Sequence, residues 1–389
     1  MTESATALTA GSQRGTDGVA RDAALEGARA VAVGLVVLTH ASFMTGFTVT
    51  GGLIGRLFGR GDYGVALFFA LSGFLLHRQF LDAQAKGRHL SARGYAARRA
   101  ARVLPAYWLT LAAVIVAVRP DLWDAVAHAL TAQIYVPTSL IPAFSQSWSV
   151  ATEIAFYAAL PFAVAALRPL RHRRPDFVVP LLALIATVSL GGLLLFGTSF
   201  PGVTLVPDRL LPGAAPMFIV GMVLAEARRA GGAIPRALRR LGRDPVACWL
   251  VAGGTYVLAT TPITGSLMLE PGQGSRIMVR VLLSVAFSLL VLLPLTLTPE
   301  DVPNWPRQVL GTSPVRWLGE MSYGVFLWHV PVFTGLYAVS GVPEFRGGIV
   351  PLLVLGLPVT LLLAWASHRF VELPWMRWAA RHAARYDRA

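Results

Sequence analysis

Arg29 and His40 are residue types that often take part in catalysis or binding, and their spacing along the chain suits a shared site. They interrupt an apolar stretch from Leu25 to about Phe47 and lie eleven positions apart. At ~100° per residue, eleven steps make three turns plus about 20°, so both side chains share one helix face. At ~1.5 Å per residue they are roughly 16 Å apart along the axis. Imidazole titrates near neutral pH and guanidinium binds anions, so the pair predicts a general base and an anion-binding group.

A structural interpretation of the same pair stays open. Arg29 would then anchor the cytoplasmic end of a membrane helix, and His40 would be a hydrogen-bonded core histidine. Ionisable residues inside a span are costly, however, and usually face the protein interior and serve a function.

Glu153 is the only carboxylate well inside any predicted span, which favours a function for it. It follows Trp148 and Ser149, and Trp148 is either an interface anchor or a core residue. Counting residues from the outer end of each span places Glu153 nearer the outer surface than His40. We nevertheless expect Glu153 to orient His40 and to stabilise its charged form.

Arg99 and Arg102 lie at the start of another apolar stretch, three positions apart and so on one helix face. Basic residues in such loops often only fix membrane topology. A tight arginine cluster at a helix start also binds phosphate well. We therefore expect Arg29, Arg99 and Arg102 to form an anion clamp at the cytoplasmic mouth, next to an aqueous edge.

Three further polar residues are candidates for lining a site. Ser72 lies mid-span beside Gly73, where small residues favour close helix packing. A nucleophilic Ser72 would need a neighbouring base, such as His40. Tyr323 caps the start of a later span, and His329 within it is interpreted as structural.

The composition is that of a multi-pass membrane protein. Hydrophobic residues make up 55% of the 389 residues, charged ones only 14%, and mean hydropathy is +0.59. Recurrent apolar stretches long enough to cross ~30 Å of hydrocarbon predict an all-α bundle of about ten transmembrane helices. The predicted spans are 28–46, 63–81, 102–119, 149–168, 177–196, 209–227, 246–262, 277–297, 322–340 and 349–368. The moderately apolar stretch 123–141 is interpreted as interfacial or re-entrant, with an eleventh span as the alternative.

The positive charges predict the orientation. Of the 34 Lys and Arg, 27 fall in segments that would share one side, and seven on the other. This asymmetry places both termini in the cytoplasm of a cell (inner or plasma) membrane protein, and it accounts for the net charge of +14 without a nucleic-acid partner.

The ends of the chain and its cysteine complete the organisation. Residues 1–20 are small and polar and are expected to be disordered, 21–373 to form one membrane domain, and 374–389 a basic interfacial tail with Trp375 and Trp378 facing lipid. No cleavable signal peptide is expected, because the first span itself directs insertion. The single cysteine, Cys248, excludes an internal disulfide or a Cys-based zinc site, and no metal is expected.

Six segments, which occur along the chain in the family's order, resemble the acyltransferase-3 family of integral membrane acyl-CoA-dependent O-acyltransferases. They are LEGARAVAVGLVVLTH, LFFALSGFLL, RRAARVLPAYWL, SWSVATEIAFY, GEMSYGVFLWHVPV and SHRFVELPW. The family's Arg and His in the first helix match Arg29 and His40, and its Arg-x-x-Arg matches Arg99 and Arg102.

The family's Trp-Ser and the acidic residue that follows match Trp148, Ser149 and Glu153. Two departures are visible: Glu26 stands where the family often has Asp, and Ile154 where it often has a second acidic residue. Some relatives carry an SGNH hydrolase-type domain after the last span, which is not expected here.

The resemblance implies transfer of an acyl, often acetyl, group from acyl-CoA to a hydroxyl of a sugar, glycan or glycosylated natural product. In that scheme His40 is the general base, and Arg29, Arg99 and Arg102 hold the CoA phosphates while the thioester reaches His40 at mid-membrane. The alternative is a transporter of a small anionic or sugar-like solute, but the chain shows no paired interrupted helices in two matching halves. A scaffold or receptor would not explain Arg29, His40 and Glu153 together.

The charge asymmetry leads to a labelling prediction. In a Cys248→Ser background, a cysteine introduced at Arg93 should resist a membrane-impermeant thiol reagent in intact cells, because loop 82–102 is expected in the cytoplasm. A cysteine at Glu344, in a predicted outer loop, serves as the positive control. Labelling at position 93 with protection at 344 would reverse the predicted orientation.

Overall fold

The computed structural model describes residues 2–88, 90–137, 140–196, 206–267, 273–299 and 302–386, with side chains from Ala23 to Ala383. All regular secondary structure in these ranges is helical, which confirms the all-α class. The helices at the ten predicted spans are α1 (Thr2–Met44), α4 (Tyr63–Ala85), α5 (Ala92–Val118), α7 (Trp148–Arg173), α8 (Val178–Phe196), α9 (Leu211–Ala227), α11 (Pro245–Leu258), α12 (Gly274–Leu297), α15 (Ser322–Ser340) and α16 (Ile349–Ser367). The other α-helices are α2 (Phe47–Thr50), α3 (Gly52–Gly59), α6 (Leu122–Ala129), α10 (Ala233–Leu241), α13 (Trp305–Leu310), α14 (Ser313–Glu320) and α17 (Leu373–Tyr386).

Seven stretches of the described residues are long and apolar enough to cross a membrane. They include α1, α4, α5, α7, α8, α12 and α16, whereas α9 and α11 are apolar but shorter, with 17 and 14 residues. The chain is thus an all-helical, multi-pass membrane protein. The full count of ten spans and the cytoplasmic termini stay predictions.

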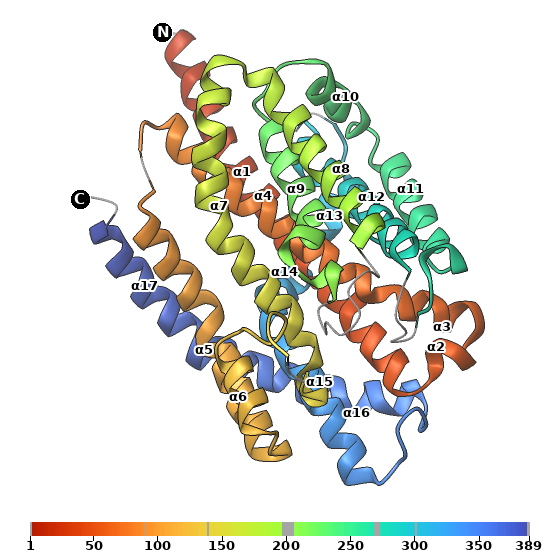
Figure 1. Cartoon of the computed structure of the whole chain (residues 1–389). Helices are drawn as coiled ribbons and strands as arrows, with labels where there is room; N and C mark the ends of the chain where they lie inside the picture. The colour runs from red at the N-terminus through yellow and green to blue at the C-terminus, as the bar shows by residue number, and fades with distance from the viewer. Residues whose placement is uncertain are drawn as a thin grey trace.

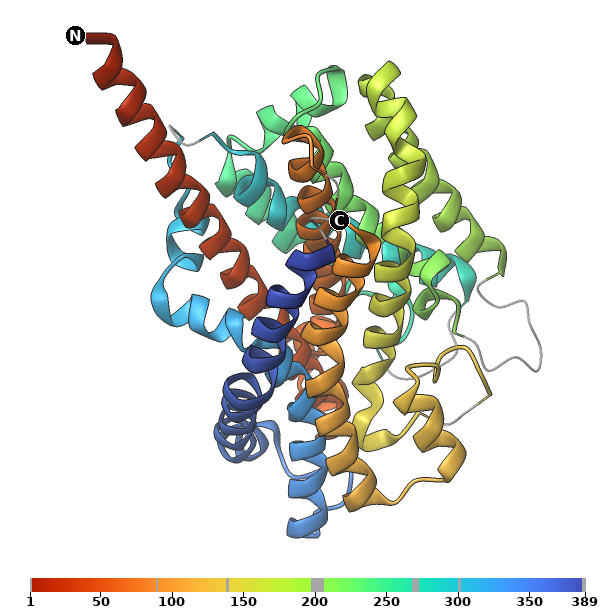
Figure 2. The same ribbon diagram turned by 90° about the vertical axis from the view of Figure 1, so that its left-hand side faces the viewer.

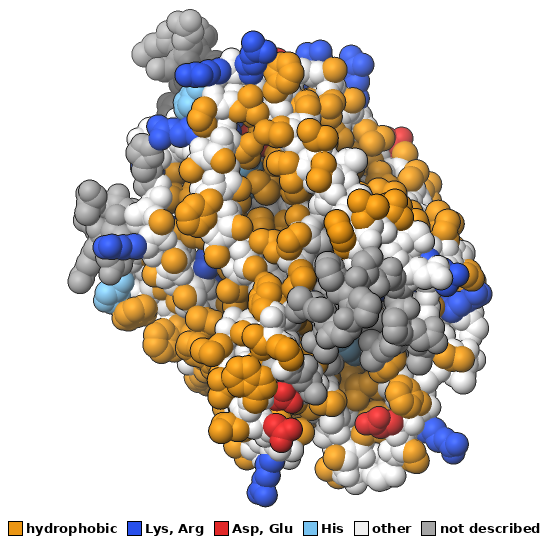
Figure 3. Space-filling model, viewed as in Figure 1, with side chains coloured by type: hydrophobic (Ala, Val, Ile, Leu, Met, Phe, Trp, Pro, Cys, Tyr) orange, Lys and Arg blue, Asp and Glu red, His pale blue; other side chains and the backbone are white. Residues whose placement is uncertain are grey.

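Loops predicted to lie on the same side of the membrane gather at the same end of the bundle. The N-terminus, the α4–α5 connection, the end of α7 and α10 lie at one end, and α2, α3, α6 and the α15–α16 connection lie at the other (Figure 1). The space-filling view shows a broad hydrophobic flank with Lys and Arg concentrated at the first end (Figure 3). This arrangement agrees with the partition of charge along the sequence.

The stretch 123–141 does not form a span. Its helix α6 has eight residues, and a 3₁₀ segment, Pro142–Ser147, follows. The Gln146 side chain donates a hydrogen bond of 2.8 Å to the carbonyl of Leu327, within α15. The segment therefore folds back into the bundle, which agrees with a re-entrant element and not with an eleventh span. As a result, α7 begins inside the protein.

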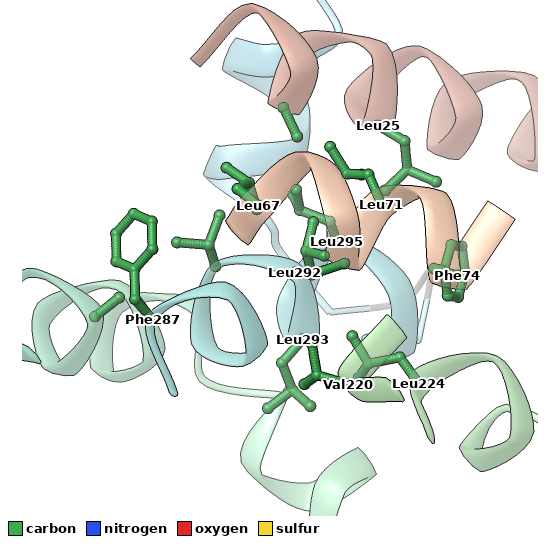
Figure 4. Packing of buried hydrophobic residues seen from close by; sticks show 14 of the residues in the cluster. Leu25, Leu67, Leu71, Phe74, Val220, Leu224, Phe287, Leu292, Leu293 and Leu295 are labelled. Carbon is green, nitrogen blue, oxygen red and sulfur yellow. The ribbon is translucent and has the colours of Figure 1, made fainter. Parts of the chain in front are cut away.

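Helix α4 lies in the middle of the bundle and is held by close backbone contacts. A Cβ atom at Gly73 would lie 2.1 Å from the carbonyl oxygen of Phe218, and one at Gly221 would lie 1.9 Å from that of Ala70. Only glycine allows α4 and α9 to approach this closely. Leucines of α4, α9 and α12 pack together in one buried cluster (Figure 4). The position of Ser72, next to Gly73, is thereby fixed.

The C-terminal tail forms helix α17, which runs beside α5 (Figures 1 and 2). A π-helical turn, His368–Glu372, joins it to α16. Trp375 and Trp378 are 48% and 46% exposed, as expected for an interfacial helix. At the other end, α1 begins at Thr2, within the segment for which the sequence predicts disorder. The division into a disordered segment, a membrane domain and a tail stays a prediction.

Candidate active site

Five helices, α1, α4, α5, α7 and α15, line one cavity with about 660 Å³ of empty space, counting the part open to the outside. Its polar lining residues are Arg29, Ser72, Arg99, Arg102, Ser149, Glu153, Tyr157, Ser322 and Tyr323. Seven of these were candidates from the sequence. Tyr157 and Ser322 were not among those candidates. Three other candidates, His40, Trp148 and His329, are not part of the described lining.

Glu153 is bound to hydroxyl groups in this cavity. Its Oε1 accepts a hydrogen bond of 2.5 Å from Ser72 Oγ and one of 2.7 Å from the Tyr157 hydroxyl. The side-chain hydrogen bonds of His40 go instead to Val36 and His329. Glu153 therefore has different partners from the one expected, and the ionisable group hydrogen-bonded to Ser72 is Glu153 rather than His40.

The depth assigned to Glu153 from the sequence was wrong. Gly61, in the turn just before α4, lies against Leu35 of α1, and Gly64 of α4 lies against Ala32. Each step along α4 towards Ser72 is thus a step along α1 away from His40. Because α7 begins inside the bundle, its Glu153 reaches Ser72 on the Arg29 side of the protein.

Two of the three arginines have free hydrogen-bonding capacity. The Nε atoms of Arg29 and Arg99 are buried and have no hydrogen-bond partner among the described residues. Arg29 lies 3.7 Å from Glu26, at the limit of an ion pair. Buried donors without partners are costly, so an anionic ligand with several acceptor oxygens would be stabilised between these guanidinium groups.

The third arginine, Arg102, is paired with a residue that the sequence did not identify as part of a site. Its Nη1 lies 3.2 Å from Glu372 Oε2, and the Glu372 side chain is completely buried. His368 Nδ1 lies 3.4 Å from the same oxygen. Arg102 is therefore not at a simple aqueous edge. The available signal was an acidic residue within the SHRFVELPW segment, at the start of a basic C-terminal region.

His40 and His329 form a pair. His40 Nδ1 lies 2.9 Å from the carbonyl oxygen of Val36 and 3.2 Å from His329 Nε2. The ring centroids are 4.9 Å apart and the rings meet edge to face at 68°. His329 is completely buried, whereas His40 is partly exposed. The histidine expected to be catalytic and the one expected to be structural are thus in direct contact.

Phe326 links the cavity to the histidine pair. Phe68 and Phe326 line the cavity, and their ring centroids are 6.3 Å apart. The Phe326 ring is also 6.0 Å from the ring of His329. The cavity with the arginines and the histidine pair are therefore neighbouring regions that share Phe326 as a common neighbour.

Trp148 lies apart from this cavity, with the Arg209 guanidinium 5.3 Å from its ring centroid. No group of three or more His, Cys, Asp or Glu residues suited to a metal ion occurs among the described residues. The site thus combines anion-binding groups, a hydroxyl–carboxylate cluster and an imidazole pair.

The chain is similar to several curated bacterial proteins. One is a Bacillus subtilis protein whose name assigns it provisionally to the peptidoglycan O-acetyltransferases. The two sequences are 26% identical over 374 residues, and the alignment covers 90% of this chain and 54% of the relative. It is 25% identical over 378 residues to the peptidoglycan O-acetyltransferase of Listeria monocytogenes, covering 90% and 55%. An O-acetyltransferase of Staphylococcus aureus is 21% identical over 392 residues, covering 90% and 56%.

The chain therefore spans about half the length of the curated relatives it matches. No solved structure matches it. The sequence model of the acyltransferase domain family matches residues 22–369, a range that contains every candidate site residue except Glu372. This protein belongs to the acyltransferase-3 family.

Proposed function

We propose that this protein is a membrane O-acyltransferase that moves an acyl group, often acetyl, from acyl-CoA to a hydroxyl of a carbohydrate or glycosylated acceptor. The observation that carries the proposal is the convergence of Arg29, Arg99 and Arg102 on one cavity next to the His40–His329 pair. Membership of an acyltransferase family supports the reaction class. No feature of the site favours the transporter alternative over this one.

The donor half of the proposal rests on the arginine cavity. CoA carries phosphate groups, and guanidinium groups with unpaired donors bind phosphate through charge-assisted hydrogen bonds. The rise of roughly 16 Å from Arg29 to His40 along α1 is comparable to an extended pantetheine arm. A donor anchored at the arginines would place its thioester past Phe326, near the histidine pair.

The transfer half rests on His40. The acceptor hydroxyl gives its proton to the imidazole while its oxygen attacks the thioester carbonyl. The new C–O bond forms, the C–S bond breaks, and the departing CoA thiolate takes the proton from the imidazolium. The balanced result is an ester and free CoA, with no metal in the scheme.

The relatives support the proposed acceptor class. Two of them are named for peptidoglycan, whose sugars offer hydroxyl groups for acylation. A glycan or a glycosylated small molecule would meet the same chemical requirement. We place the protein in the cell membrane with both termini in the cytoplasm, so that acyl-CoA has access to the arginine cavity.

The donor assignment predicts that Arg99→Gln weakens acyl-CoA binding by about tenfold to a hundredfold, the range expected for a lost hydrogen bond to a charged group. Isothermal titration of the purified protein measures it. Arg93→Gln, an exposed arginine in the first turn of the same helix, is the matched control and should bind normally. Unchanged affinity in Arg99→Gln would show that the donor phosphates bind elsewhere.

Arg102 needs a separate control because it also holds the buried Glu372. Arg102→Ala should cost about 3–5 kcal/mol of stability, since one member of a buried ion pair loses its partner. Adding Glu372→Gln should recover most of the lost thermal stability. Only this double variant can show whether Arg102 also contributes to donor binding.

The base assignment predicts that His40→Ala reduces transfer by about 10² to 10⁴, the usual cost of losing a general base. Acyl-CoA affinity should stay at the wild-type value, and the melting temperature should change by only a few degrees. His172→Ala, at an exposed position, is the control for a neutral histidine substitution. A stable His40→Ala protein with near-wild-type transfer would remove His40 as the base.

A further inference from the structure

We propose that His329 is the positioning residue for His40: it accepts a hydrogen bond from His40 Nδ1–H and so keeps Nε2 of His40 free to take the proton. The inference rests on the proposed function of His40 as the base. It assigns a specific role to the second histidine of the pair.

The tautomer of His329 follows from its backbone contact. Its Nδ1 lies 3.0 Å from the carbonyl oxygen of Val325, one turn earlier in α15. A carbonyl oxygen can only accept a hydrogen bond, so Nδ1 carries the proton. A neutral imidazole has a single N–H group, which leaves Nε2 of His329 with a lone pair.

The tautomer of His40 follows from that of His329. Two acceptors face His40 Nδ1: the carbonyl oxygen of Val36 at 2.9 Å and the Nε2 lone pair of His329 at 3.2 Å. Nδ1 of His40 therefore carries a proton, shared between them. In the neutral ring Nε2 is then unprotonated, which is the state that a general base requires.

Burial separates the roles of the two rings. His329 is completely buried and packs near Phe326 and Phe333, at ring-centroid distances of 6.0 and 6.1 Å. His40 is partly exposed, so of the two rings it is the one that is not enclosed by protein on all sides. When His40 takes a proton at Nε2, its Nδ1–H can still donate to the Val36 carbonyl oxygen and to His329 Nε2.

This arrangement performs the orienting task that a carboxylate has in the Ser-His-Asp triad. A neutral acceptor suits an apolar surrounding, because burying it costs far less than burying an unpaired charge. His329 thus supplies orientation without adding another ion to the bundle.

Nitrogen-15 NMR of the histidine-labelled protein tests the tautomers directly. Signals are assigned by the loss of one signal in His40→Gln and in His329→Gln. Both neutral rings should carry their proton on Nδ1. An Nε2–H tautomer at either residue would overturn the inference, even if the protein proves to be an acyltransferase.

Kinetics tests the role. His329→Leu removes the acceptor while filling the space, and should lower kcat by about tenfold to a hundredfold with little change in KM for either substrate. His329→Gln can present its Oε1 in place of the ring Nε2 and should recover most of that loss. A purely structural role would reduce the yield of folded protein in both variants and leave kcat per folded molecule unchanged.

Three outcomes separate this inference from the proposed function. Loss of transfer in His40→Ala with full kcat in His329→Leu would overturn the inference and leave the proposed function standing. Equal losses of kcat in His329→Leu and His329→Gln would also overturn it. A wild-type protein without any transferase activity would overturn both.

Discussion

Burying ionised groups in an apolar helical bundle is costly, and this constraint governs where the charged residues of this protein lie. Glu372 is completely buried and meets Arg102, and Glu226 is buried between His77 and Arg171. Glu153 accepts two hydroxyl hydrogen bonds inside a cavity that also contains three arginines. Arg29 and Arg99 each keep a buried Nε donor without a hydrogen-bond partner among the described residues, and both line this cavity, which is why we propose it as an anion site.

Backbone packing determines the positions of these groups. The glycine contacts between α4 and α9 and between α1 and α4 leave no room for side chains, so the helices cannot slide without steric overlap. Ser72 and Arg29 are therefore held at fixed heights on neighbouring helices. The histidine pair lies further along α1, next to Phe326 of the cavity lining, and in the proposed function the two regions hold the two ends of the donor.

The sequence predicted the elements well, because a membrane span is a local property. Each of the ten predicted spans coincides with a helix in the described residues, and the cavity contains the arginines, Ser72 and Glu153 that the residue types had suggested. Contacts between distant segments were not predictable in this way. His40 and His329 are 289 positions apart, and Arg102 and Glu372 are 270 apart, so spacing along the chain carries no signal for either contact. The depth of Glu153 was wrong because residue counting assumes that α7 starts at the surface, whereas the re-entrant segment before it starts α7 inside the bundle.

The most direct measurement of the central claim is group transfer by the purified protein. The detergent-solubilised wild-type chain would be incubated with acetyl-CoA labelled in the acetyl group and with a panel of peptidoglycan fragments, free sugars and glycosides. The account predicts that label moves to at least one acceptor as an alkali-labile ester, with release of one free CoA thiol for each ester formed. Tight binding of acetyl-CoA without label transfer to any hydroxyl acceptor, or ester formation without release of CoA, would contradict it.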